Sequence, residues 1–238
     1  MTGYCSCSSL YVTLLHLQNP MSAPVSLEIV LGFAMFALVF VTLERFFPFR
    51  QQRVLRPGWM TDVLYYLVGC FVGHFSDAIT AGTILLFGWA LGFQSGGFAG
   101  QQPEWLQFIE LVLIADFLAY CYHRACHKTP WLWRLHKVHH MSTRMDWLAN
   151  VRLHPLDKIL GDCFQFIPIF SLGFAHTPLL AYTIMLGFQG FLNHSNIKVE
   201  YGPLRWIIAS PTFHHWHHCC DREAYDKNFA PHLVIFDF

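Results

Sequence analysis

The sequence predicts an all-α membrane protein with several transmembrane helices and a helical cytoplasmic cap that carries a histidine metal site. The chain is 54% hydrophobic and only 13% charged, which is too apolar for an ordinary soluble domain of 238 residues. Its apolar residues gather in long runs, and about 20 helical residues suffice to cross a bilayer. Most of its 15 histidines lie between residues 123 and 218. Acidic and basic residues are equal at 15 each, so no charge excess predicts a nucleic-acid partner.

The N-terminal part is expected to contain an arm followed by membrane spans. Residues 1–20 are interpreted as a poorly ordered or misassigned arm, because the membrane-like sequence opens at a second methionine, Met21. Residues 21–104 are assigned to the N-terminal spans, the first of which covers 27–43. Several arginines follow it, and arginine next to a span favours the cytoplasm, so residues 44–62 are placed there.

The next apolar run, 63–93, is longer than one span needs, so it is expected to tilt, kink or double back. The sequence SGGFAGQQPE, residues 95–104, predicts a loop. Residues 105–122 form another span, which carries Glu110 and Asp116 and returns the chain to the cytoplasm.

A polar, membrane-hugging segment is expected from His123 to Asp162, followed by a hairpin. The apolar run 163–192 is interrupted by Gly173 and Pro178, which favours two shorter helices joined by a turn. A single span would instead separate the histidines beyond it from the earlier ones by about 30 Å. The hairpin therefore lets all of them share one side of the membrane.

Three histidine motifs, HRACH, HKVHH and HHWHH, predict a metal centre. Histidines three or four residues apart on a helix lie near one face, so each motif is expected to be helical and to offer its ligands together. Neutral imidazoles crowd around a cation without mutual repulsion, and eight exceed the four to six that one ion takes. Two ions are therefore expected, with His194 in FLNHSN as a ninth ligand. The expected ligands are His123, His127, His136, His139, His140, His194, His214, His217 and His218.

Three further residues are candidates for hydrogen bonds around the ligands. Asp116 shares a helical stripe with His123, although an interhelical or capping bond explains it equally well. His154 precedes a proline and His215 points off the shared face, and for both an ordinary hydrogen-bonded histidine is slightly favoured. The remaining histidines, and the polar residues near the motifs, are interpreted as interfacial or solvated: His16, His74, His176, His232, Asp146, Asn150, Asp157, Asp226 and Asn228.

These motifs, with ASPTFHHWHH, NVRLHPLDK and DKNFA around them, resemble the fatty acid hydroxylase and sterol desaturase superfamily from about residue 105 onward. The resemblance implies a fatty acid hydroxylase-like domain over 105–238 and a non-haem di-iron centre on the nine histidines. It also implies a monooxygenase-type activity that uses O2 to hydroxylate or desaturate a C–H bond of a sterol, fatty acid or related lipid. Zinc is expected to be able to replace iron in purified material.

Electrons are expected from a separate electron-transfer protein, because the chain has no glycine-rich nucleotide motif and no cysteine set for an iron–sulfur cluster. The chain departs from the superfamily at Cys219-Cys220, whose role is left open, and at its end at Phe238, which is interpreted as a truncation.

Two other functions fit the sequence less well. A zinc-dependent membrane hydrolase needs an open site with a general-base glutamate, and HExxH is absent. A non-catalytic metal-binding membrane protein would place its histidines within the spans rather than at one end. The lipid, and the choice between hydroxylation and desaturation, stay open.

Overall fold

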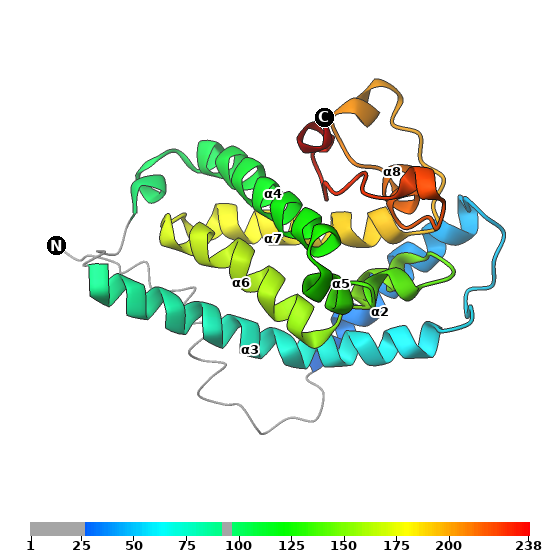
Figure 1. Ribbon diagram of the computed structural model, residues 1–238, viewed down its shortest axis with the longest axis horizontal. Helices are drawn as coiled ribbons and strands as arrows, with labels where there is room; N and C mark the ends of the chain where they lie inside the picture. The colour runs from blue at the N-terminus through cyan, green and yellow to red at the C-terminus, as the bar shows by residue number, and fades with distance from the viewer. Residues whose placement is uncertain (1–26, 92–96) are drawn as a thin grey trace.

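The computed structural model describes residues 27–91 and 97–238, so the predictions for residues 1–20 and for the start of the loop at 95–104 lie outside it. Within these ranges the chain is built from seven α-helices and short 3₁₀ turns, with two isolated β-bridges and no strand (Figure 1). The all-α prediction is confirmed. The α-helices are α2 Leu27–Phe46, α3 Trp59–Leu91, α4 Glu104–Lys128, α5 Pro130–His136, α6 Pro155–Ser171, α7 His176–His194 and α8 Pro211–His217.

Three of the described helices, α2, α3 and α4, are long and apolar enough to cross a membrane. The run that was expected to tilt, kink or double back is one continuous 33-residue helix, α3, so the alternative of doubling back is wrong. At about 1.5 Å per residue this helix exceeds the roughly 30 Å hydrocarbon core. Large apolar side chains such as Leu38 and Phe71 are exposed, as expected of surfaces that face lipid.

The predicted hairpin is confirmed as α6 and α7, which turn at Gly173 with a positive φ of 74°. The turn packs on the 3₁₀ turn η1 (Phe98–Gln101), where the Ala99 amide donates to the Leu172 carbonyl at 3.3 Å. A Cβ on Gly97 would lie 2.4 Å from that carbonyl oxygen, so only glycine permits the approach. The hairpin tip therefore lies beside the start of α4, and α7 carries the chain back toward the other end of α4.

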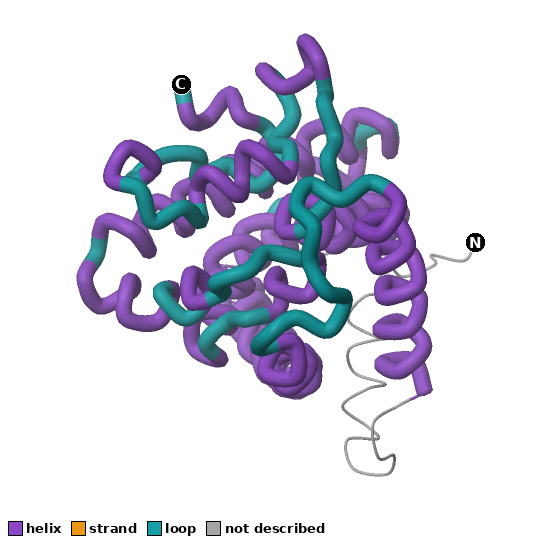
Figure 2. Tube along the Cα trace, turned by 90° about the vertical axis from the view of Figure 1, so that its right-hand side faces the viewer, coloured by secondary structure: helices purple, strands orange, loops and turns teal. Residues whose placement is uncertain are grey.

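Two apolar cores hold the helices in place. In one, Leu111 of α4, Ile169 of α6 and Tyr182 of α7 are fully buried against one another. In the other, Phe40 of α2 packs with Trp147 and with Phe191 of α7. Trp147 begins the 3₁₀ turn η3 (Trp147–Val151). Helices α2 and α7 both end on the right-hand side of Figure 1, and Figure 2, seen from that side, shows several of the connecting loops facing the viewer.

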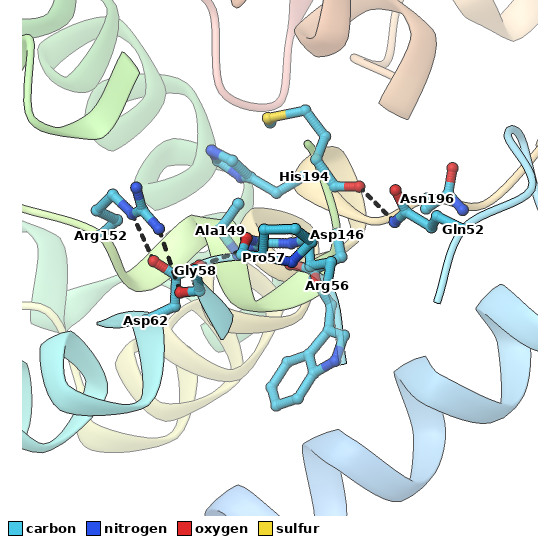
Figure 3. Close-up of polar contacts among 12 residues, drawn as sticks. Gln52, Arg56, Pro57, Gly58, Asp62, Asp146, Ala149, Arg152, His194 and Asn196 are labelled. Atoms are coloured by element: carbon cyan, nitrogen blue, oxygen red, sulfur yellow. Dashed lines mark hydrogen bonds and ion pairs between the residues drawn. The ribbon is translucent and has the colours of Figure 1, made fainter. Parts of the chain in front are cut away.

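A buried ion network ties the α2–α3 loop to the segment before α6 (Figure 3). The Arg56 guanidinium is 2% exposed, lies 2.6 Å from the Asp62 carboxylate of α3 and also pairs with Asp146. Arg152 pairs with the other oxygen of Asp62. The interpretation of Asp146 as a solvated residue was wrong, because the carboxylate is buried and both neutralises Arg56 and caps η3.

Candidate metal centre

All nine predicted histidines meet at the end of the molecule where α4 and α7 finish, and they divide into two groups. Within each group, the ring nitrogens lie within 4.8 Å of one another. The five-histidine group consists of His123, His127, His136, His140 and His217. The four-histidine group consists of His139, His194, His214 and His218.

The two later motifs are divided between the groups, which the sequence analysis did not predict. In HKVHH the helix α5 ends at His136, and His139 starts a separate 3₁₀ turn, η2 (His139–Met141), so the motif is not one helix. In HHWHH the neighbours His217 and His218 belong to different groups. Adjacent helical residues point about 100° apart at 3.6 residues per turn, so they cannot aim at one ion. The prediction of one shared face was therefore wrong for these two motifs, whereas His123 and His127 of HRACH do belong to one group.

The Nδ1 atoms of five of these histidines lie against acceptor oxygens, which fixes their tautomers. Carbonyl and carboxylate oxygens only accept, so each of these Nδ1 atoms carries a proton and the neutral ring has its lone pair on Nε2. The pairs are His123 with Phe229 O (2.8 Å), His136 with Asp157 Oδ2 (2.9 Å), His139 with Arg152 O (3.2 Å), His194 with Gly190 O (2.8 Å) and His217 with Lys227 O (2.7 Å).

At least one close contact in the four-histidine group cannot be a hydrogen bond between neutral rings. The Nε2 atoms of His139 and His194 are 3.0 Å apart, although both must present lone pairs. His214 Nε2 lies 3.0 Å from that of His194 and 3.1 Å from that of His218. Two nitrogens bound at about 2.1 Å and at right angles to one ion would be about 3.0 Å apart. The spacing of this group therefore fits a shared metal ion.

The five-histidine group presents buried lone pairs in the same way. Among the described residues, the Nε2 atoms of His123, His136 and His217 have no hydrogen-bond partner, and neither do those of His127 and His140. A buried polar atom without a partner is costly, and five nitrogens gathered at one place fit the binding of a cation. A metal ion would satisfy all of them.

Protonation does not relieve this crowding at neutral pH. Burial, together with the neighbouring histidines, lowers the pKa of His139, His214 and His218 well below the usual histidine value. Burial likewise lowers the pKa of His217 to about 4. These rings are neutral at pH 7, which is the form that binds metals.

Asp157 is a partner of the five-histidine group that sequence reasoning set aside as solvated. Its buried carboxylate accepts from His136 at 2.9 Å and from the Tyr122 hydroxyl at 2.7 Å. Gly161, one turn further along α6, leaves room for the Tyr122 ring, because a Cβ there would lie 3.1 Å from it. The sequence does contain a signal for this partner. It is the acid of HPLD, which lies in the first turn of the helix that starts at Pro155.

The three residues proposed as hydrogen-bond partners behave differently from one another. In the described residues the Asp116 carboxylate accepts from the ring of His232 and from the backbone amides of His232 and Leu233, so of its two predicted roles the bond to another segment is the one observed. His154 caps α6 by accepting from the Leu156 amide at 3.2 Å, so it serves the helix rather than the centre. His215 donates to the backbone carbonyl of His194 at 3.1 Å and therefore supports a ligand's backbone.

A C-terminal strap, defined as residues 227–237, supplies two of the carbonyls. His217 donates to Lys227 O and His123 donates to Phe229 O, while the Phe229 ring packs against His127. Asp226 and Asn228 flank Lys227 with φ values of 60°, a conformation that Asp and Asn adopt more readily than most residues. The DKNFA sequence thus bends the chain so that alternate carbonyls reach the histidines.

A cavity of 470 Å³ adjoins the centre on the side of α8. Its walls include His127 and His140 of the five-histidine group and His218 of the four-histidine group. Cys219 and Cys220 also line it, with the Cys219 thiol 3.3 Å from Asp221. Solutes in this cavity can approach rings of both groups.

Comparison with known proteins identifies relatives. The fatty acid hydroxylase family model matches residues 108–238. An ornithine lipid hydroxylase from Rhizobium tropici is 33% identical over 149 residues, which cover 62% of this chain and 45% of the relative. A human alkylglycerol monooxygenase is 30% identical over 125 residues, covering 51% of this chain and 27% of the relative. A very-long-chain aldehyde decarbonylase from Oryza sativa is 26% identical over 136 residues, covering 52% and 20%.

The chain therefore spans less than half of the length of these curated relatives. No solved structure matches it.

Proposed function

The chain belongs to the fatty acid hydroxylase family, and on this premise we propose that it is a membrane-bound di-iron oxygenase that hydroxylates or desaturates a C–H bond of a lipid. The observation that carries the proposal is the convergence of nine imidazoles into two groups whose ring nitrogens lie close together. Each group has four or five nitrogen donors, which suits one borderline ion, so the ligands are those nine histidines.

Two iron ions in these groups would supply the activation of O2 that attack on an unactivated C–H bond requires. The all-nitrogen donor set also suits zinc, which we expect to replace iron in purified material. The residues of the chain hold the rings in one tautomer, through Asp157 and the strap carbonyls, and bury the nitrogens away from water.

The proposed substrate is a lipid that reaches the centre from the bilayer. Two of the relatives are named as enzymes of ornithine lipids and of alkylglycerols, and the described helices of this chain expose broad apolar faces. A chain of the lipid would lie against such a face, with its reacting carbon at the histidine end of α4. Electrons would come from a separate electron-transfer protein.

The histidine centre is proposed to lie on the cytoplasmic side. Lys198, just after α7, donates its amide to the Phe47 carbonyl at 2.8 Å, and Phe49 donates to the Asn196 carbonyl at 2.9 Å. The arginine-rich segment after α2 is therefore beside the segment that follows His194. Because arginine near a span favours the cytoplasm, the centre shares that side. The division into N-terminal spans over 21–104 and a hydroxylase domain over 105–238 belongs to the same proposal.

The test is lipid analysis under isotopically labelled dioxygen. The chain is expressed in a bacterial membrane together with an electron-transfer system, and extracted lipids are compared with those from the double variant His139→Ala/His217→Ala. We expect a new lipid that depends on O2 and is absent with the variant. A label in the product identifies hydroxylation, and loss of two hydrogens without label identifies desaturation. Lipid cleavage that is independent of O2 would contradict the proposal and favour a hydrolase.

A further inference from the structure

Asp116 is a fully buried carboxylate in the middle of α4 that the proposed metal chemistry does not use directly. It lies seven residues, or about 10 Å along the helix, before His123. Its Oδ1 accepts from the His232 amide at 3.0 Å and the His232 ring at 2.7 Å, and its Oδ2 accepts from the Leu233 amide at 2.7 Å. All three donors belong to the C-terminal strap.

The other hydrogen bonds of strap residues 231–234 to distant residues join the strap to segments other than α4. Asn193 of α7 donates to the Pro231 carbonyl at 2.7 Å. The Ala209 amide donates to the His232 carbonyl at 2.7 Å, and Val234 donates to the Ile207 carbonyl at 3.1 Å. Apart from the ligand bond of His123, the hydrogen bonds between the strap and α4 in the described residues are those of Asp116.

This anchoring has a consequence for His123, because that ring and the carboxylate sit on the same helix. The strap's Phe229 carbonyl orients His123, and its Lys227 carbonyl orients His217. If the strap were hydrogen-bonded to α7 but not to Asp116 of α4, the Phe229 carbonyl would no longer be held beside His123. The ring would then lose the acceptor that fixes its tautomer.

The four-histidine group takes no ring acceptor from the strap in the described residues; the strap instead bonds residues beside two of its ligands, Asn193 and Phe213. Its fixed rings, His139 and His194, donate to the carbonyls of Arg152 and Gly190. Neither carbonyl belongs to the strap, and Arg152 is held by Asp62 of α3.

We propose that Asp116 is a positioning residue for one metal ion: by anchoring the strap to α4 it orients His123 and His217 and so holds the ion of the five-histidine group, but not the ion of the four-histidine group. The inference rests on the proposed two-iron centre. It assigns to a membrane-embedded acid a role in metal affinity without contact with the metal.

The experiment compares Asp116→Asn with Glu110→Gln, a half-buried acid on the same helix that makes no hydrogen bond to the strap among the described residues. Purified protein is loaded with Fe(II) without oxygen, and iron per chain and its rate of transfer to a chelator are measured. Loss of an outer hydrogen-bond partner typically weakens a metal site about 10- to 100-fold. We expect one of two irons to leave about 10- to 100-fold faster in Asp116→Asn, and no change in Glu110→Gln.

Single-site backgrounds identify which iron is affected. In His139→Ala, which keeps the five-histidine group, adding Asp116→Asn should speed the release of the remaining iron. In His217→Ala, which keeps the four-histidine group, the same addition should leave the release unchanged. Faster release in both backgrounds, or in neither, would overturn the inference.

A second, milder variant keeps the test decisive if Asp116→Asn does not fold. His232→Ala removes one of the three hydrogen bonds to Asp116 but keeps both backbone amides, so a smaller and equally selective effect is expected. An equal effect on both irons would overturn the inference. A wild-type protein that holds fewer than two irons would instead overturn the two-iron proposal, and this inference with it.

Discussion

The two histidine groups are built from similar rings but held by different parts of the molecule. The five-histidine group draws on a buried carboxylate, Asp157, and on strap carbonyls, and three of its rings line the cavity. The four-histidine group uses the carbonyls of Arg152 and Gly190, and one of its rings lines the cavity.

The comparison indicates that the rings of the two groups are oriented by different acceptors, so each half of the centre is held by its own contacts. A carboxylate beside His136 makes that ring a more basic ligand, whereas a backbone carbonyl mainly fixes orientation. The five-histidine group also depends on a segment more than 100 residues away from its first ligands, since His123 and Phe229 are 106 positions apart. Variants that disturb one half should therefore leave the other measurable.

The largest expected effect follows from removing a ligand in either half. His139→Ala and His217→Ala should each lower lipid oxidation more than about 100-fold, because losing a ligand costs more than losing its outer partner. Product formation by mass spectrometry measures this. His154→Ala, which removes only a helix cap, is the control and should keep most of the activity. Near-normal activity in either ligand variant would mean that the two halves do not act as one centre.

The next effect concerns the carboxylate that distinguishes the five-histidine group. Asp157→Asn should weaken iron binding in that group about 10- to 100-fold and leave the four-histidine group unchanged. Chelator competition followed by metal analysis measures it. Asp162→Asn on the same helix is matched, since Asp162 pairs with Lys158 away from the histidines. Equal weakening by both variants would assign the effect to α6 as a whole.

A smaller effect is expected from the support of the four-histidine group. Asp62→Asn weakens the ion pair with Arg152, but the Arg152 carbonyl still faces His139. The rate of iron release from the four-histidine group should therefore rise less than about 10-fold. The five-histidine group should not respond. Release rates in the His217→Ala background report this group alone. Faster iron release from the five-histidine group alone would contradict the conclusion that Asp62 supports the four-histidine group.

The smallest effect is a pH dependence of the metal-free protein. Burial lowers the pKa of His217 to about 4, while the unfolded chain binds this proton near pH 6.5. Between these values the unfolded state holds more protons, so stability falls as the pH drops from about 6.5 toward 4. Thermal unfolding of chelator-treated protein should show a lower midpoint at pH 5 than at pH 7. His217→Gln should reduce the slope, and an unchanged slope would contradict the neutral buried ring.

The sequence predicted the parts of this arrangement that depend on local patterns. Apolar run length identified α2 and α4, the interruption at Gly173 identified the hairpin, and histidine spacing identified eight of the rings, to which His194 was added from its place after the hairpin. Each of these signals is contained in a short stretch of sequence, so it can be recognised without knowing how the helices pack.

The rest depended on contacts between distant segments. The separation of His217 from His218 follows from helical geometry together with where α4 and α7 end. Asp157 was taken as solvated because its burial comes from α6 packing against α4. The carbonyls of Lys227 and Phe229 carry no residue-type signal. The sequence left the role of Asp116 open between a ligand bond and an interhelical bond, because its partner His232 is 116 positions away.

The most direct test of the central claim is the iron content of the purified wild-type chain beside His139→Ala and His217→Ala. Two ions per chain in the wild type, and one in each variant, are predicted by two separate groups of histidines. One ion in the wild type, or the loss of all iron in both variants, would contradict the division into two sites.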